Sequence, residues 1–312
     1  MGIKVSIIKL TFNRKEYIAK SLQEYLRLGL PWVELIVVDN SNEVDNSHLF
    51  QNLNNKNITY LKQDQNVGVE ARNVGIRQAK GDIIICLDDD VLGIHEEQIN
   101  LIINLFDQDK QLGGICFKVL HPETKKNINW CHHCKVEDFA NKVFLTNEIT
   151  EGAVAFRKEA LLKTDLYPKR YFISHEGPDL AIQLMNKGYT IIYSPTIEVT
   201  HWHTSVARAD WRRYYYDTRN LIWLVIRHYS FFYAVRMLVV GLGAMFVYSL
   251  RDGYLRYWFK GILDALRQCS EVISEREVMN DYTKLILKKI DKQRPNVLYM
   301  IHKRLLSNTI KI

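Results

Sequence analysis

The chain has 312 residues, which is enough for one large α/β domain with an appendage or for two modest domains. Apolar residues make up 47% of it and charged residues 25%, so the composition excludes a wholly disordered protein. The net charge of +7 is unevenly placed, because residues 226–312 carry 15 Lys and Arg against 7 Asp and Glu. Such a basic segment can serve nucleic acid or anionic lipid.

Two features bear on the cellular compartment. The opening residues, MGIKVSIIKL, lack the charged leader and apolar core of a secretion signal, and we expect them to begin a cytosolic protein. The five cysteines (Cys86, Cys116, Cys131, Cys134 and Cys269) are an odd number, which favours reduced thiols. Residues 131–134 read Cys-His-His-Cys, half of a zinc site, but no second pair follows at a finger-like spacing. A reduced polar loop is therefore the favoured interpretation.

The first half of the chain alternates short apolar runs with amphipathic segments. Strands are predicted at residues 4–10, 34–38, 58–61 and 82–87, and helices at 15–28 and 68–80, with Gly29 and Gly81 as stop signals. Alternation of this kind, with short connections, predicts a mainly parallel sheet with helices on both faces.

Polar residues follow three of these predicted strands. Thr11 and Asn13 come after the first strand, Asp39 after the second, and Asp88, Asp89 and Asp90 after the fourth. Ligands of parallel sheets bind beyond the carboxyl ends of the strands. The sequence therefore predicts a binding site at this edge.

The second half is less regular. Strands are predicted at residues 113–119, 151–157 and 189–193, with residues 197–200 leading into His201. A helix is predicted over 178–187, with proline in its first turn and glycine just past its end.

From about residue 211 the chain is aromatic, basic and apolar together. Residues 237–250 contain no charge, but a membrane span needs about 20 apolar residues. An in-plane or re-entrant helix fits at least as well, a buried helix of a core or a dimer is the third alternative, and whether 231–250 spans the membrane stays open. The run from Trp202 to Arg219, with Arg208, Arg212 and Arg213, could form a lid over a diphosphate. It accompanies no recognisable RNA-binding module, so no nucleic-acid partner is expected.

The three adjacent carboxylates of Asp88 to Asp90 repel one another unless a cation or hydrogen-bond donors offset them. Oxygen-rich clusters suit Mg²⁺ or Mn²⁺, which join carboxylates to substrate phosphates. The alternative is a solvated acidic turn that caps the next helix.

The order of the motifs resembles that of one known family. NVGVEARNVGIRQAKGDIIICLDDDV (66–91) resembles the donor-binding region of family 2 glycosyltransferases of the GT-A fold, and VSIIKLTFNR (5–14) and ELIVVDNSN (34–42) resemble its first two strands. EGAVAFRKEAL (151–161), HEGPDLAIQLMNKGY (175–189) and IEVTH (197–201) are similar to its acceptor-side elements. The resemblance covers about residues 3–220, and it is to the rhamnosyltransferase-like bacterial enzymes that assemble glycans.

The resemblance implies roles for individual residues. Those that would contact the nucleotide sugar are Thr11, Asn13, Glu16, Asp39, Arg72, Asp88 and Asp89. Those that would hold Mg²⁺ or Mn²⁺ are Asp90, Asp88 and His201, with His203 as a rival for the last position.

A transferase that inverts the sugar carbon needs a base for the acceptor hydroxyl. The family usually has Glu-Asp followed two residues later by Asp, whereas this chain reads Glu176-Gly177-Pro178-Asp179. Glycine therefore stands where the base is often assigned. Glu176, in the loop before the helix, is favoured as the base, and Asp179 could serve instead or could only cap the helix.

The sequence thus predicts a GT-A transferase domain over 1–220 and a basic, aromatic-rich helical segment over 221–312. The resemblance implies an inverting, metal-dependent transfer from a UDP- or dTDP-sugar to a glycan or lipid-linked acceptor in cell-surface polysaccharide synthesis. We expect a peripheral location on the cytoplasmic face of the membrane, through residues 226–312. The alternatives are a non-catalytic sugar-nucleotide or glycan-binding protein and a nucleotidyltransferase, which lacks support because no glycine-rich loop with a lysine follows the first strand.

Overall fold

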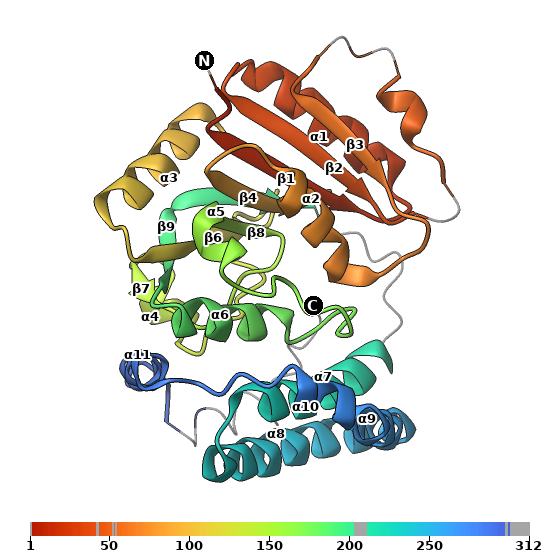
Figure 1. Cartoon of the computed structure of the whole chain (residues 1–312), viewed down its shortest axis with the longest axis vertical. Coiled ribbons are helices and arrows are strands. Elements are labelled where there is room, and N and C mark those ends of the chain that lie inside the picture. The colour runs from red at the N-terminus through yellow and green to blue at the C-terminus, as the bar shows by residue number, and fades with distance from the viewer. Residues whose placement is uncertain are drawn as a thin grey trace.

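The computed structural model describes residues 2–41, 44–51, 53, 55–202, 211–296 and 299, and every structural statement below concerns these. One sheet runs through the upper part of the molecule in the order β3-β2-β1-β4-β8-β6-β9-β5, with β7 paired to β9 (Figure 1). The strands are β1 (Val5–Thr11), β2 (Val33–Asp39), β3 (Ile58–Lys62), β4 (Ile83–Asp88), β5 (Val91–Leu92), β6 (Leu112–Leu120), β7 (Phe144–Leu145), β8 (Ala153–Arg157) and β9 (Thr190–His201).

The N-terminal half of the sheet is parallel, as predicted. β1 pairs with β2 and with β4, and β2 pairs with β3, all in parallel register. Successive side chains of these strands enter opposite cores: Ile7 and Ile85 lie in one, Ile8 and Ile84 in the other. Both faces are buried, which is why these strands read as continuous apolar runs.

The C-terminal half is mixed, and here the expectation of a mainly parallel sheet is too simple. β8 pairs antiparallel with both β4 and β6, while β6 and β9 pair in parallel. The predicted strands at 189–193 and 197–200 form a single twelve-residue strand, β9. The register of β9 against β6 shifts between Phe117 and Lys118. Because of this irregularity, the sequence pattern looks like two strands with a break between them.

Helices cover both faces of the sheet. α1 (Lys15–Leu28) and α3 (Glu96–Gln108) pack on one face, and α2 (Arg72–Gln78), α5 (Lys158–Leu162) and α6 (Glu176–Asn186) on the other. The predicted helix 68–80 is a 3₁₀ turn, η2 (Gly68–Ala71), followed by α2. The remaining short elements are η1 (Ser47–Leu49) and α4 (Val136–Phe139).

The C-terminal helices form a separate layer beneath α6 (Figure 1). They are α7 (Trp211–His228), α8 (Phe231–Arg251), α9 (Leu255–Arg267), α10 (Cys269–Ser274) and α11 (Asp281–Asp291). α7 is continuous across residue 220, so a boundary at that residue falls inside a helix that packs against α8 and α9. A boundary ahead of Trp211 suits the structure better.

Candidate functional site

The predicted polar residues do meet at the carboxyl edge of the parallel strands. Thr11 lies opposite Asp39 in the pairing of β1 with β2, and Leu10 lies opposite Asp88 in the pairing of β1 with β4. Three neighbouring strands therefore end together, and their last residues lie side by side at one edge of the sheet.

Asp39 lies at the end of β2 and is fully buried. Its carboxylate accepts hydrogen bonds from the backbone N–H of Ser41 at 2.7 Å, from Asn46 Nδ2 at 2.9 Å and from the Tyr60 hydroxyl at 2.6 Å. Lys62 Nζ lies 3.7 Å away. Burial alone would raise the pKa of Asp39, but the hydrogen bonds from Ser41, Tyr60 and Asn46 outweigh it and hold that pKa below its usual value. Asp39 is thus an ionised carboxylate at the centre of a buried hydrogen-bond network.

The loop after β1 carries two more predicted residues. Asn13 adopts a left-handed backbone conformation with φ of 53°, and its N–H donates to Ser41 Oγ at 2.7 Å, which ties this loop to the Asp39 pocket. Glu16 is exposed in the first turn of α1. The structure brings Asn13 to the site and leaves Glu16 at its solvent side.

The acidic turn after β4 has a cationic partner that the sequence analysis missed. Arg14 Nη1 lies 3.3 Å from Asp89 Oδ1 and also pairs with Asp90. The Thr11 hydroxyl donates to Asp89 Oδ2 at 2.6 Å. Burial, and then the neighbouring Asp90, raise the pKa of Asp89 to about 7. Arg14 therefore supplies positive charge to a cluster whose like charges disfavour full ionisation.

Asp90 and His201 are in contact, as the resemblance implied. β5 pairs with β9 so that Val91 lies opposite His201, and this pairing places His201 Nε2 3.1 Å from Asp90 Oδ1. Both side chains are almost fully buried. Burial raises the pKa of Asp90, but His201 and Arg14 outweigh it and keep that pKa below its usual value. His203, the rival ligand, lies outside the described residues.

The donor set at this point fits a divalent cation in part. Asp90 Oδ1 is buried with His201 Nε2 as its near neighbour, and the His201 ring is oriented by the Asn129 amide 2.7 Å from its Nδ1. Asp88, the third predicted ligand, instead pairs with Arg72. Within the described ranges no three His, Cys, Asp or Glu side chains are gathered closely enough to hold a metal. Two protein ligands completed by substrate phosphates and water are a common arrangement for Mg²⁺.

A second polar cluster lies on the other side of Asp88. Arg72, on α2, is 2% exposed, pairs with Asp88 and lies 3.6 Å from Glu151 Oε2. Glu176, the favoured base, lies in the first turn of α6 and not in the loop before it, and it is buried nearby. Burial raises the pKa of Glu151 and of Glu176, and for Glu151 the charge of Glu176 adds to the effect. Glu151 was not assigned a role from the sequence, although it opens the quoted motif EGAVAFRKEAL.

Asp179, the second candidate base, is occupied. Its carboxylate accepts from Arg227 Nη1 at 2.6 and 2.7 Å, from the Tyr171 hydroxyl at 2.9 Å and from Gln183 Nε2 at 2.7 Å. His228 Nε2 lies 3.1 Å away. The residue is fully buried and joins α6 to α7. This geometry is that of a structural ion pair. Neither oxygen of Asp179 is left to take a proton from the hydroxyl of an acceptor substrate.

Two other segments singled out from the sequence form no binding site among their described residues. His132 Nδ1 lies 2.9 Å from Thr146 Oγ1 and Trp130 Nε1 donates to the carbonyl of Cys134. The Cys-His-His-Cys segment is therefore a hydrogen-bonded loop. Arg219, from the predicted lid, is buried and donates to the Tyr171 carbonyl at 2.9 Å; Arg208 lies outside the described residues.

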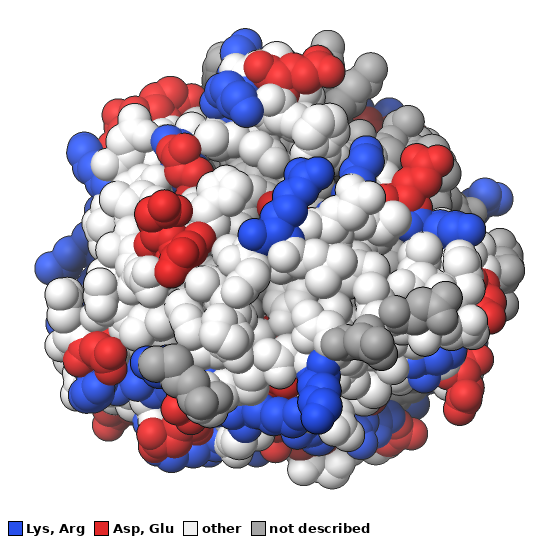
Figure 2. All heavy atoms as spheres, turned by 90° about the horizontal axis from the view of Figure 1, so that it is seen from above, with Lys and Arg blue, Asp and Glu red and all other residues white. Residues whose placement is uncertain are grey.

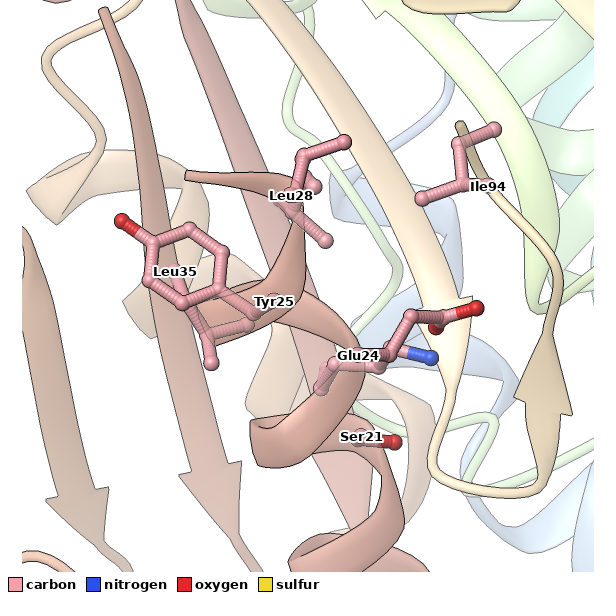
Figure 3. Close-up of a pocket in the computed structure, with 8 residues that line it drawn as sticks. Ser21, Glu24, Tyr25, Leu28, Leu35 and Ile94 are labelled. Atoms are coloured by element: carbon pink, nitrogen blue, oxygen red, sulfur yellow. The ribbon is translucent and has the colours of Figure 1, made fainter. Parts of the chain in front are cut away.

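A small crevice lies under the acidic turn, between α1 and the sheet (Figure 3). Its polar groups are already used: the Ser21 hydroxyl donates to the Asp89 carbonyl, Glu24 accepts from the Gly93 N–H, and Lys9 Nζ donates to the Asp88 carbonyl at 3.3 Å. The side chains around the crevice hold the acidic turn in place, and the crevice itself is not a ligand site.

Comparisons with known proteins agree with this geometry. Residues 6–164 match the model of "Glycosyl transferase family 2". The O-antigen chain rhamnosyltransferase WbaN of Salmonella anatum is 22% identical over 193 residues, which cover 58% of this chain and 60% of that protein's length.

Two solved structures share the fold. S. aureus TarS 1-349 in complex with UDP-GlcNAc superposes with a TM-score of 0.59 at 17% identity, covering 94% of this chain and 90% of that one. The mannosyltransferase PcManGT from Pyrobaculum calidifontis, in complex with GDP-Man and Mn²⁺, gives 0.53 at 16% identity, covering 95% and 89%. The GT-A fold predicted from the sequence is confirmed.

Proposed function

The chain belongs to glycosyltransferase family 2, and from this membership we propose that it is a metal-dependent, inverting glycosyltransferase. The donor is a UDP- or dTDP-sugar, and the acceptor is a hydroxyl of a glycan or lipid-linked glycan in cell-surface polysaccharide synthesis. Similar proteins bind UDP-GlcNAc or GDP-Man, and one relative is a rhamnosyltransferase, so nucleotide-sugar donors are the substrate class to expect.

The observation that carries the proposal is the convergence of three polar groups at the carboxyl edge of the parallel strands. Asp39 is an ionised carboxylate that holds Ser41 and Asn46 in place, Arg72 and Asp88 form a charged pair, and Asp90 contacts His201. This edge is where α/β sheets bind nucleotides. The spacing follows the strand order, because β2, β1 and β4 are adjacent.

In the mechanism that we propose, Asp90 and His201 would hold Mg²⁺ or Mn²⁺, which would supply the charge that stabilises the departing diphosphate. Asp39 and Asn13 would position the nucleotide base, and Asp88 would face the ribose. Thr11 holds Asp89 by the 2.6 Å hydrogen bond and would keep the acidic turn in position. A carboxylate near Arg72, either that of Glu176 or that of an acid close to it, would take the proton from the hydroxyl of the acceptor substrate.

The test is turnover of a panel of UDP-, dTDP- and GDP-sugars with Mn²⁺ and with a chelator, followed by release of nucleoside diphosphate. We expect one class of donor to be consumed only with metal, and the product to have the inverted anomeric configuration by NMR. Donor binding without any turnover would instead identify the non-catalytic alternative.

We also propose that the C-terminal helices attach the protein peripherally to the cytoplasmic face of the membrane. α8 is the one helix among the described residues long and apolar enough to cross a membrane. Only 11% of its most apolar window is buried. Its outward positions, Phe232, Val239, Val240 and Leu250, are each more than half exposed, and Arg236 is the charged residue among them. Exposed apolar stripes with basic flanks suit an anionic lipid surface.

An in-plane position of α8 is more consistent with its packing than a span. Gly241 lies against Leu221 of α7 so closely that a Cβ there would come within 2.3 Å of Leu221 Cδ2. α7 in turn holds the buried charges of Arg219 and Arg227, which bond to the transferase part. A spanning α8 would have to leave α7 or draw these charges into lipid, which is costly.

At the end of the molecule opposite these helices, the described residues form no basic patch of the kind that binds nucleic acid (Figure 2). Viewed there, Lys and Arg are interspersed with Asp and Glu (Figure 2). A nucleic-acid footprint would show a basic patch on one face. The absence of a nucleic-acid partner stays part of the proposal.

Replacing Val239 and Phe232 with aspartate should each lower binding to vesicles of phosphatidylglycerol and phosphatidylethanolamine by roughly tenfold, because burying such a side chain stabilises by about 1.5–3 kcal/mol. Co-sedimentation measures it. Leu26→Asp, at an exposed leucine of α1, is the matched control and should bind as the wild type does. If the wild type and the three variants bind the vesicles equally, the exposed apolar face of α8 is not the membrane-binding surface.

A further inference from the structure

Several buried polar atoms around Arg72 have no hydrogen-bond partner among the described residues. They are Arg72 Nε and Nη1, both carboxylate oxygens of Glu151, Glu176 Oε2 and the Tyr167 hydroxyl. Two of them are neighbours of the Glu151 carboxylate: Arg72 Nη1 lies 3.6 Å from its Oε2, and the Tyr167 hydroxyl acts to lower its pKa. Arg72 and Glu176 are 2% and 4% exposed. Buried polar groups are nearly always satisfied, so a group of them unsatisfied together indicates a place where a polar ligand binds.

The position of Glu151 is fixed from two sides. It directly precedes Gly152, whose carbonyl accepts from the Asp88 N–H at 3.1 Å, so the start of β8 is held at the end of β4. Gly152 has φ of +72°, and a Cβ there would come within 2.4 Å of Asp88 Cγ. Glu151 is thereby placed next to the last residue of a strand that ends in the site.

Gly177, on α6, leaves room for the Glu151 carboxylate. A Cβ built at Gly177 would lie 2.9 Å from Glu151 Oε1 and 3.1 Å from the Ile149 carbonyl. The glycine that interrupts the expected acidic motif is therefore the residue that allows Glu151 to lie there. Residue 177 lacks the acid that the motif predicts, and Glu151 is an acid without a role assigned from the sequence. The Glu151 carboxylate lies in the space that a side chain at residue 177 would take.

The two side chains differ in exposure. The Glu151 side chain is 23% exposed although both of its carboxylate oxygens are buried, whereas Glu176 is 4% exposed. The side chain that lies nearer the surface needs the smaller rearrangement to reach an incoming hydroxyl. Burial and the charge of Glu176 raise the pKa of Glu151 to about 8, and the Arg72 guanidinium, 3.6 Å from Glu151 Oε2, acts in the opposite direction. A raised pKa makes the ionised carboxylate a stronger proton acceptor.

We propose that Glu151 is the catalytic base of the transfer and that Glu176 is a positioning residue behind it. The assignment rests on the proposed glycosyltransferase function. In the step, the acceptor O–H bond breaks and its proton passes to the Glu151 carboxylate. The oxygen forms the new bond to the anomeric carbon, and the bond from that carbon to the diphosphate oxygen breaks with its electron pair leaving on the nucleoside diphosphate.

The test needs no knowledge of the natural acceptor, because water can take the place of the acceptor hydroxyl. Nucleoside diphosphate release is followed with the UDP-, dTDP- and GDP-sugar panel for wild type, Glu151→Gln, Glu176→Gln and the control Glu123→Gln, an exposed acid of the β6–β8 connection. Glu151→Gln should lower kcat by about 100-fold or more, with the dissociation constant for the donor changed less than about threefold. Glu123→Gln should leave both unchanged.

Chemical rescue separates a base from a structural residue. Azide ion carries no proton that must be removed, so adding it to Glu151→Ala should restore release at least tenfold and yield a glycosyl azide of inverted configuration. Glu176→Gln should show no such rescue. Gly177→Ala, which crowds Glu151 without removing it, should lower kcat in the same direction.

The outcomes are distinct. If the wild type consumes a donor but Glu151→Gln keeps more than a third of the rate, or folded Glu151→Ala shows no azide rescue, this assignment is wrong and the proposed function stands. If the wild type consumes none of the donors, both are overturned. Azide rescue of Glu176→Ala alone would reverse the two roles and so contradict the assignment.

Discussion

Asp90→Asn is expected to lower metal-dependent donor turnover roughly 100-fold, which corresponds to about 3 kcal/mol of transition-state stabilisation. The amide keeps the size of the side chain but loses the charge that would attract a divalent cation. It also weakens the pairing of Asp90 with Arg14. Because Asp90 Oδ1 lies 3.1 Å from His201 Nε2, both donors should lose affinity for the same ion.

Two measurements check this prediction. Turnover with the donor panel gives the rate, and calorimetric titration of Mn²⁺ with UDP or dTDP gives the affinity for metal independently of catalysis. Asp107→Asn is the matched control, since Asp107 is an exposed acid paired only with Lys110 by a contact of 3.2 Å. Unchanged metal affinity and rate in Asp90→Asn would remove Asp90 from the site.

Asp179→Asn is expected to destabilise the protein by about 3 kcal/mol while leaving the activity of the folded molecules within about threefold. Removing one partner of a buried ion pair leaves the other charge uncompensated, which costs about 3–5 kcal/mol. Arg227 keeps a contact to Asp165 at 3.5 Å and to Glu275 at 3.8 Å, so the lower value applies. For a chain of this length we expect a fall in Tm of about 6 °C.

The same network makes stability depend on pH. Burial alone would raise the pKa of Asp179, but His228 and Arg227 outweigh it and hold that pKa at about 2. A depressed carboxyl pKa contributes stability above the unfolded value, about 3.9, and this is lost as pH falls toward 2. The wild type should therefore lose stability over that window, and Asp179→Asn should lose less of it.

Thermal unfolding between pH 2 and pH 7, with turnover measured well below Tm, distinguishes the structural role from a catalytic one. Glu159→Gln, in an exposed pair with Lys163, is the control and should shift stability by less than about 0.5 kcal/mol. An Asp179→Asn variant that melts as the wild type does but has lost its turnover would show that Asp179 is the base after all.

The sequence predicts the donor side of the protein well because its signals are local. The strands before Thr11, Asp39 and Asp88 are short apolar runs with helical segments between them, and such runs place their last residues at one edge whatever the rest of the chain does. The contact of Asp90 with His201 was implied only by the resemblance, since it depends on the pairing of β5 with β9 across more than 100 residues.

The parts that could not be predicted are set by tertiary packing. Asp179 lies two residues after Gly177, in a motif that suggests a catalytic base. Its ion-pair partner, Arg227, lies 48 residues later in the chain, on another helix. The approach of Glu151 to Gly177 is likewise a contact between the turn before β8 and α6. Arg14 could have been found, because a cation in the loop after the first strand is a natural partner for three acids at the same edge.

The most direct test of the central claim, that the acidic edge of the parallel strands binds a nucleotide sugar, is calorimetric titration of UDP, dTDP and GDP with and without Mn²⁺. We predict saturable binding of at least one of them, strengthened by Mn²⁺ and weakened by both Asp39→Asn and Asp90→Asn. If none of the three binds with a dissociation constant below roughly 1 mM, or about 4 kcal/mol of binding free energy, or if neither variant alters the binding, the site is elsewhere and the account is wrong.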